Sequence, residues 1–218
     1  MEMKESALNE LKRMYALKKR DIVVRLREFE KVRTDGTDEE IFTELAFCLL
    51  TPQSKAKSCW EAISDIKDQK LLVKGDATDL KGSLKCVRFH NKKAQYLVEA
   101  RRRFLNDGRI SLRPWLKGCG DVFECREWLV KNIKGMGYKE ASHFLRNIGL
   151  GQDISILDRH ILRNLNAFGI VEEIPESLGR ATYLRIERAM ADFSSRISIP
   201  LSHLDLLLWY KETGEIFK

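Results

Sequence analysis

The chain contains few prolines, few cysteines and no long apolar run, and each shortage narrows what it can be. Only 4 of its 218 residues are proline and 5 are cysteine. No run approaches the ~18 consecutive apolar residues of a membrane-spanning helix, and no apolar leader stretch follows Met1. We therefore expect a cytoplasmic protein with no membrane partner.

The five cysteines stand apart from one another, and none forms a Cys-x-x-Cys pair. Cysteine metal sites use close spacings, and small secreted domains use a framework of several disulfides. The sequence therefore predicts neither a disulfide framework nor a four-cysteine metal cluster. Cys48 lies in the apolar segment 45–50, where we expect a buried free thiol.

Acidic residues are fewer than basic ones, 32 against 39, which gives a net charge of +7. A positive excess favours polyanions such as nucleic acid, because each phosphate contact releases counterions. An ordinary basic surface would have the same composition, so charge alone does not select a partner. At 44% apolar and 33% charged residues, the chain is typical of globular proteins and long enough for one large domain or two small lobes.

Apolar residues recur with helical spacing along most of the chain, which predicts an all-α fold. One further helix should begin with Asp38 as its N-cap and end or kink at Pro52. The segment 108–112 could form a short extended piece. The other expected helical segments are 4–32, 54–72, 92–105, 121–134, 139–148, 159–168, 181–193 and 202–211.

Two glycines, Gly135 and Gly137, flank Met136 between two expected helices, the first ending near Ile133 and the second beginning near Tyr138. Glycine tolerates positive φ and lets a foreign backbone approach closely. The start of the second helix presents unpaired N–H groups, so the turn suits a DNA phosphate held by main-chain donors. A simple tight turn is the alternative. Met136 should fill the core.

Lys139 follows this turn, and Asp158 precedes another expected helix. The positive end of the helix dipole favours the neutral amine of a first-turn lysine, which is the nucleophilic form. Asp158 could be an N-cap, and a carboxylate held by backbone N–H groups stays ionised beside a cationic transition state. The alternatives are a solvated lysine and a purely structural cap. His160 could contact a phosphate or serve as an ordinary core or surface histidine.

Segments 135–139 (Gly-Met-Gly-Tyr-Lys) and 158–161 (Asp-Arg-His-Ile) together resemble the signature of the helix–hairpin–helix–GPD superfamily of DNA glycosylases. Segment 49–54 is similar to the part of endonuclease III whose glutamine fills the gap left by a flipped base. Segment 89–94 is similar to the part that carries its intercalating side chain. Segments 139–147 and 204–210, with the terminal lysine, resemble the archaeal-type 8-oxoguanine DNA glycosylase/AP lyase.

This resemblance implies a two-lobed helical fold with the active site in the cleft between the lobes. Residues 1–37 would pack with a C-terminal lobe of residues 150–218, and residues 38–149 would form the other lobe. The protein would be a monomer that binds double-stranded DNA containing 8-oxoguanine or an abasic site. It would use Lys139 as nucleophile and Asp158 as carboxylate partner, with no cofactor and no metal.

The resemblance also implies the remaining site residues. Gly135, Gly137 and His160 would contact the DNA backbone, Gln53 would fill the gap, and Phe89 would wedge into the stack or lie on the lesion. Base recognition would fall to residues on the last helix and at the chain end, namely Asp205, Trp209 and Lys218.

Each of these residues has a structural alternative. Trp209 could stack on the flipped purine or be a core tryptophan, and Phe89 could be an ordinary buried phenylalanine. Lys218 would offer its α-carboxylate to the guanine edge, or it could be a frayed terminus. An acceptor aimed at the N7 hydrogen of 8-oxoguanine would discriminate against guanine, which lacks that hydrogen.

Two other functions fit parts of the sequence. The chain could be a glycosylase/lyase for another oxidised base, or a helix–hairpin–helix protein that only binds DNA. The pair of Lys139 and Asp158 argues against the second, because DNA binding alone requires neither.

Overall fold

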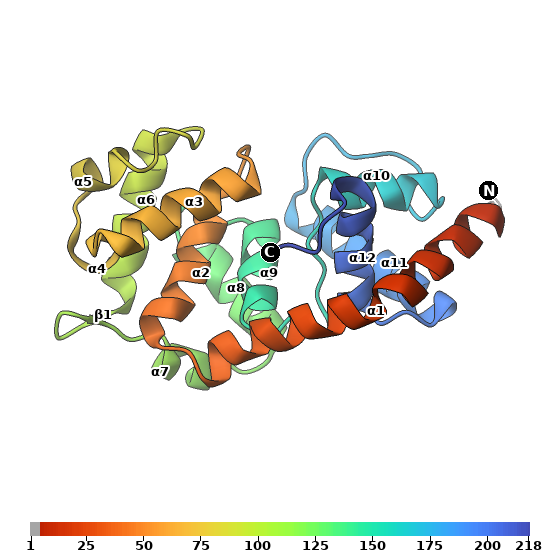
Figure 1. Ribbon diagram of the computed structural model, residues 1–218, viewed down its shortest axis with the longest axis horizontal. Coiled ribbons are helices and arrows are strands. Elements are labelled where there is room, and N and C mark those ends of the chain that lie inside the picture. The colour runs from red at the N-terminus through yellow and green to blue at the C-terminus, as the bar shows by residue number, and fades with distance from the viewer. Residues whose placement is uncertain (1–4) are drawn as a thin grey trace.

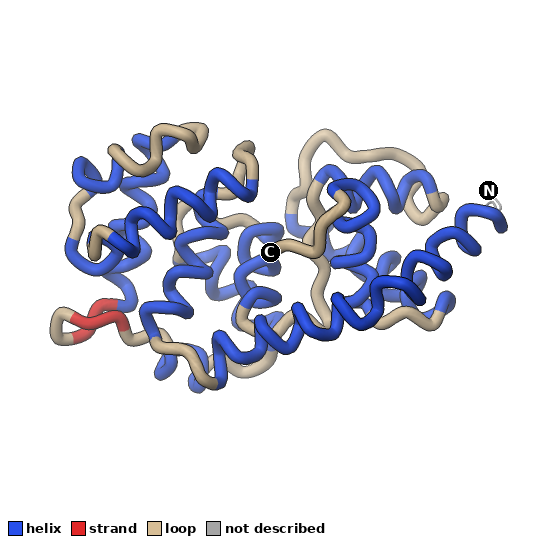
Figure 2. Tube along the Cα trace, in the orientation of Figure 1, coloured by secondary structure: helices blue, strands red, loops and turns tan. Residues whose placement is uncertain are grey.

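The computed structural model describes residues 5–218, and these are mostly helical (Figure 1). The elements are α1 (Glu5–Thr34), α2 (Asp38–Leu50), α3 (Ala56–Asp68), α4 (Leu71–Lys74), α5 (Ala77–Lys81), α6 (His90–Phe104), β1 (Leu105–Asn106), β2 (Arg109–Ile110), α7 (Arg113–Gly118), α8 (Val122–Asn132), α9 (Tyr138–Asn147), α10 (Arg159–Ala167), α11 (Arg180–Ile197) and α12 (Leu201–Thr213). The all-α prediction is confirmed. The possible extended piece becomes the second strand of a small antiparallel hairpin, β1–β2 (Figure 2). Residues 1–4, which include the predicted start of the first helix, lie outside the described residues.

The N-cap of α2 is Thr37, so the prediction of Asp38 was wrong by one position. The Thr37 hydroxyl accepts the N–H of Glu40, and the Glu40 carboxylate accepts the N–H of Thr37 at 2.7 Å. This reciprocal capping box satisfies two otherwise free donors, which a lone Asp cap at 38 cannot do. Asp38 instead accepts the N–H groups of Leu112 and Arg113 and ties α7 to α2.

Cys119 and Cys125 form a disulfide, which the cysteine spacing did not predict. A turn before α8 brings their Cα atoms to 5.5 Å, within the range of bridged cysteines. The two cysteines are six residues apart, so they lack the Cys-x-x-Cys spacing that would have indicated a pair. Cys48 is a buried free thiol, as expected.

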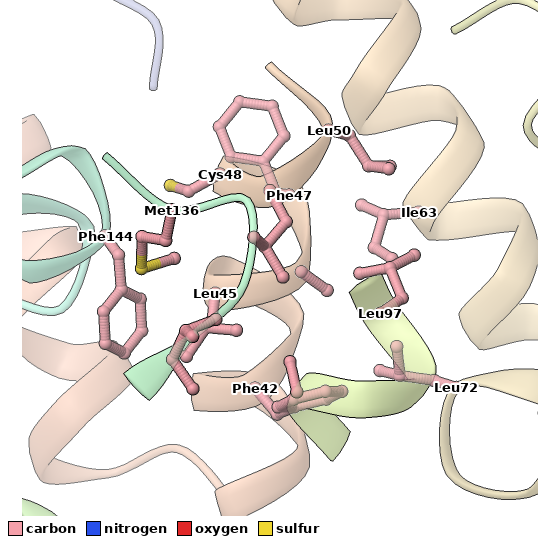
Figure 3. Close-up of a cluster of buried hydrophobic side chains, with 14 of the residues drawn as sticks. Phe42, Leu45, Phe47, Cys48, Leu50, Ile63, Leu72, Leu97, Met136 and Phe144 are labelled. Atoms are coloured by element: carbon pink, nitrogen blue, oxygen red, sulfur yellow. The ribbon is translucent and has the colours of Figure 1, made fainter. Parts of the chain in front are cut away.

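The buried apolar side chains form two clusters. The first joins α2, α3, α6, α8 and α9, and includes Met136, which points into the cluster near Phe144 (Figure 3). The second joins α10, α11 and α12 with one side of α1. The chain passes from the first cluster at Ile154 to the second at Leu157. The core position predicted for Met136 is confirmed.

Helix α1 runs along both groups of helices (Figure 1). It contributes Leu11 and Phe29 to the second cluster. We propose that the two clusters are the cores of the two lobes, with residues 1–37 belonging to the C-terminal one. No helix within residues 5–218 has both the length and the apolar character needed to span a bilayer.

Candidate active site

The hairpin between α8 and α9 uses its two glycines differently. Gly135 has a φ of +86°, and a Cβ there would collide with the ring of Tyr96. Gly137, the N-cap of α9, has an extended backbone with a φ of −93°, so it does not need glycine's left-handed freedom. Its N–H donates to the Glu140 carboxylate at 3.2 Å. One of the donors expected to hold a phosphate is therefore already capped by a side chain.

Lys139 lies in the first turn of α9, and its amine has two partners. Nζ donates to the hydroxyl of Thr51 at 3.1 Å and lies 3.2 Å from a carboxylate oxygen of Glu140. The Lys139 side chain is 23% exposed. The alternative of a freely solvated lysine is therefore wrong.

Asp158 is the N-cap of α10, and its carboxylate accepts the N–H of Ile161 at 2.8 Å. Burial raises the pKa of Asp158 above its ordinary value and is the largest influence on it. The bond from Ile161 and the positive charges of His160 and Lys139 lower that pKa by less. The expectation that the hydrogen bond keeps the carboxylate ionised omits burial, which outweighs the bond and makes the carboxylate a better proton acceptor.

Lys139 and Asp158 line one cavity of about 730 Å³. Its wall combines the loop after α2, one face of α9, the start of α10, part of α12 and the end of the chain. Seven of the predicted site residues line it: Gln53, Lys139, Asp158, His160, Asp205, Trp209 and Lys218. Gly135, Gly137 and Phe89 are not part of the lining. The fold therefore gathers residues that are distant in sequence around a single space.

Trp209 is half-buried, unlike Leu206, Leu207 and Leu208 before it, which fill the second core. The His160 ring meets the Trp209 ring edge to face, with centroids 5.2 Å apart. The indole Nε1 is buried with no hydrogen-bond partner in the described part of the chain. Trp209 thus belongs to the cavity wall rather than to the core.

Asp205 lines the cavity but is largely buried, with 4% of its surface exposed. One oxygen accepts the N–H of Ile156 at 3.0 Å, and the other lies 3.6 Å from Arg146. Burial raises the pKa of Asp205 to about 6. Its oxygens are engaged with protein groups, and the bond to Ile156 holds the segment that leads to Asp158.

The chain end folds back onto the first cluster rather than fraying into solvent (Figure 1). The Lys218 ammonium pairs with buried Glu44 and lies 3.6 Å above the ring centroid of Trp60. Burial lowers the pKa of the Lys218 amine. The frayed-terminus alternative is wrong, since Lys218 lines the cavity.

Gln53 and Phe89 lie on neighbouring exposed loops. Both have left-handed backbones, with φ values of +54° and +61°. Phe89 is 50% exposed, and the Arg88 guanidinium lies 4.9 Å from its ring centroid. The alternative of a buried phenylalanine is wrong.

Sequence reasoning missed most of the other residues of the lining, among them the polar side chains of Thr51, Glu140, His143 and Arg146. His143 follows Lys139 by one helical turn, which places both on one face of α9. Burial lowers the pKa of His143 well below its usual value, so its imidazole is neutral. Helical spacing could have identified His143, whereas Thr51 carries no local signal. Within residues 5–218, no cluster of three or more His, Cys, Asp or Glu side chains could hold a metal ion.

Comparison with known proteins agrees with this geometry. Residues 22–199 match the family model described as 8-oxoguanine DNA glycosylase. An 8-oxoguanine DNA glycosylase/AP lyase from Fusobacterium nucleatum is 47% identical over 215 residues, which is 99% of each chain. The crystal structure of the Thermotoga maritima 8-oxoguanine DNA glycosylase has a TM-score of 0.86 and 35% identity, covering 98% of this chain and 99% of that one.

A Methanocaldococcus jannaschii 8-oxoguanine glycosylase/lyase, solved in complex with a 15mer DNA containing 8-oxoguanine, has a TM-score of 0.85 and 37% identity. The match covers 95% of this chain and 99% of that one. These likenesses extend over nearly the whole chain and agree with the resemblance found in the sequence motifs. The chain belongs to the archaeal-type 8-oxoguanine DNA glycosylase/AP lyase family of the helix–hairpin–helix superfamily.

Proposed function

We infer that this protein removes 8-oxoguanine from double-stranded DNA and then cleaves the strand at the resulting abasic site. Its likeness to the Fusobacterium nucleatum 8-oxoguanine DNA glycosylase/AP lyase over 99% of both chains supports this activity. The observation that carries the chemistry is the shared cavity of Lys139 and Asp158. A pure DNA-binding module has no need of an amine and a partly buried carboxylate facing one space.

The reaction begins when the damaged nucleotide leaves the stack and enters the cavity, because a base within a duplex is out of reach. Lys139 loses a proton to Asp158, and the neutral amine attacks C1′ of the deoxyribose. The bond from C1′ to the base breaks, and its electron pair leaves with the base. Asp158 passes the proton on to the departing base, and its regained negative charge stabilises positive charge that develops on the sugar.

Strand cleavage follows from the covalent intermediate. The nitrogen of Lys139 keeps its bond to C1′, the sugar ring opens, and a protonated Schiff base forms. Loss of a C2′ proton then expels the 3′ phosphate by β-elimination. Thr51 and Glu140 favour this reaction because both contact Nζ of Lys139 and limit the positions that the amine can adopt.

DNA binding falls to the hairpin and to the exposed loops. Main-chain groups at Gly135 and Gly137 and the ring of His160 contact phosphates. Gln53 fills the gap left by the flipped nucleotide, and Phe89 wedges between bases. Their exposure supports these roles. The protein acts as a monomer.

Recognition of the lesion falls to three residues that line the cavity. Trp209 stacks on the purine, and Lys218 contacts the guanine edge. Asp205 acts beside them and also holds Ile156. The half-buried position of Trp209 and the inward course of the chain end support this arrangement.

Borohydride trapping on an 8-oxoguanine duplex tests the function. We expect the wild type and the exposed-lysine control Lys131→Gln to form a covalent adduct with this duplex and none with a guanine duplex. Lys139→Gln should form no adduct but still bind DNA. Trapping of Lys139→Gln at the wild-type level would refute its role. A duplex panel containing oxidised pyrimidines separates this activity from that of a glycosylase for another base.

A further inference from the structure

Lys93 is a buried lysine that lies outside the cavity. It belongs to α6 and is only 4% exposed. Its ammonium donates to the carbonyl oxygens of Leu50 and Pro52, each at 2.7 Å, and to the hydroxyl of Ser54 at 3.1 Å. All three acceptors are neutral. A buried cation held by neutral oxygens usually costs stability compared with an apolar side chain of the same shape, so this lysine calls for an explanation other than packing.

The position of Leu50 supplies part of the physical reason. Leu50 is the last residue of α2, a helix without a basic residue in its last turn. The final carbonyl groups of a helix lack intrahelical donors and form the negative end of its dipole. Lys93 therefore caps α2 from a different helix. Because it also reaches Pro52 and Ser54, it fixes the path of the chain just beyond the helix.

The loop that Lys93 fixes carries Gln53, and the same lysine is tied to the loop that carries Phe89. The backbone N–H of Lys93 donates to the carbonyl of Phe89 at 3.1 Å. The Ser54 hydroxyl, which accepts from Lys93, also accepts the N–H of Arg88 at 3.0 Å. Gln53 and Phe89 both have left-handed backbones, a conformation that a non-glycine residue keeps only when its surroundings enforce it.

We propose that Lys93 is a positioning residue that joins the Gln53 loop to the Phe89 loop, so that the two side chains enter the duplex as one rigid unit when the base is flipped. This inference rests on the proposed function of those two residues. Burial lowers the pKa of Lys93 to about 8, which leaves most of the amine protonated at neutral pH and able to donate all three bonds.

Two substrates separate this role from general support of the fold. Excision of 8-oxoguanine from a duplex requires base flipping, whereas Schiff-base trapping on a single-stranded oligonucleotide with a preformed abasic site does not. The variants are Lys93→Met, which keeps the apolar stem, and Ser54→Ala, which removes only the shared hydroxyl. Lys92→Met is the matched control, because Lys92 is the exposed neighbour on the same helix.

We expect Lys93→Met to excise from the duplex about tenfold more slowly, with trapping on single-stranded DNA within about twofold of wild type. Ser54→Ala should show the same selectivity to a smaller degree, and Lys92→Met should behave as wild type. Equal losses on both substrates, or no loss, would overturn the proposal. If Lys93→Met does not fold, the proposal is tested by Ser54→Ala alone, through the ratio of its duplex excision rate to its single-stranded trapping rate.

A double-mutant cycle adds a readout that a purely structural role would not change. If Lys93 acts through the Phe89 loop, Ser54→Ala should slow excision far less in a Phe89→Ala background than in the wild type. Additive effects would contradict the inference. Failure of the wild type to be trapped on either substrate would instead contradict the proposed function, so the two failures are distinguishable.

Discussion

Lys139 and Glu140 are neighbours in sequence and form an ion pair, with Nζ 3.2 Å from Oε1. The other oxygen of the Glu140 carboxylate accepts the N–H of Gly137, also at 3.2 Å. One side chain thus contacts both the proposed nucleophile and a proposed phosphate donor of the hairpin. A phosphate that binds at Gly137 competes with Glu140 for this N–H. Because Glu140 also contacts Lys139, DNA binding at the hairpin is linked to the position of the Lys139 amine.

Replacing Glu140 by glutamine should slow the chemistry without unfolding the protein. The amide oxygen of Glu140→Gln can still cap Gly137, but the ionic attraction that positions Nζ is lost. We expect trapping at saturating DNA to be roughly tenfold slower, with little change in the unfolding midpoint. Glu40→Gln is the matched control, since Glu40 closes the capping box of α2 away from the cavity. A wild-type trapping rate for Glu140→Gln would show that the ion pair has no part in the reaction.

The acidic limb of the excision rate against pH should report Asp158. Below its pKa the carboxyl is protonated and cannot accept a proton from Lys139, so the rate falls as the pH falls. Because burial raises this pKa above 3.8, the fall should begin at a higher pH than an ordinary aspartate would give. Single-turnover rates across a pH series measure it. Asp158→Asn should lower the rate by about 10²–10⁴ and abolish this limb.

His160→Gln tests the same assignment from the opposite direction. The positive charge of His160 lowers the pKa of Asp158, so its removal should move the acidic limb to higher pH. Saturating enzyme keeps any weakening of DNA binding out of the measured rate. A limb that stays in place or moves to lower pH would mean that another group titrates there.

Local sequence signals predicted most of the helices and singled out Lys139 and Asp158, which line one cavity. They failed where two neighbouring residues could both cap a helix, and where a helix was very short. Thr37 and Asp38 are both good N-cap residues, and Glu40 decides between them by completing a capping box with Thr37. The helices α5 and α7 were missed because they contain five and six residues, too few for apolar periodicity to appear.

Long-range contacts of the site had no sequence signature. Thr51 and Lys139 are 88 positions apart, and Glu44 and Lys218 are 174 apart. The motif around Lys139 predicted a nucleophile, but only the folded chain brings the Lys139 amine to the Thr51 hydroxyl. The raised pKa of Asp158 was missed for the same reason, since burial depends on the whole fold.

The two hairpin glycines should differ when each is replaced by alanine. Gly135→Ala introduces a Cβ at positive φ and against Tyr96, and we expect a loss of at least about 1 kcal/mol in the free energy of unfolding. Gly137 has an extended backbone, and its nearest obstacle is the Glu140 carboxylate at 3.0 Å, which can move. Gly137→Ala should therefore stay folded and weaken DNA binding. Urea denaturation and duplex titration measure the two effects, and equal destabilisation would contradict the distinction.

The strongest stability effect should come from Arg126 and Glu187, a buried ion pair between α8 and α11. Their side chains are 1% and 7% exposed, with an N–O distance of 2.6 Å. Arg126→Met leaves the Glu187 charge buried and unpaired, which should cost about 3–5 kcal/mol in urea denaturation. Adding Glu187→Gln removes that charge and keeps an oxygen for the N–H of Ser155, which Glu187 accepts at 2.9 Å. The double variant should therefore be more stable than Arg126→Met alone. If it is less stable, lost packing around Arg126 rather than an unpaired charge explains the cost.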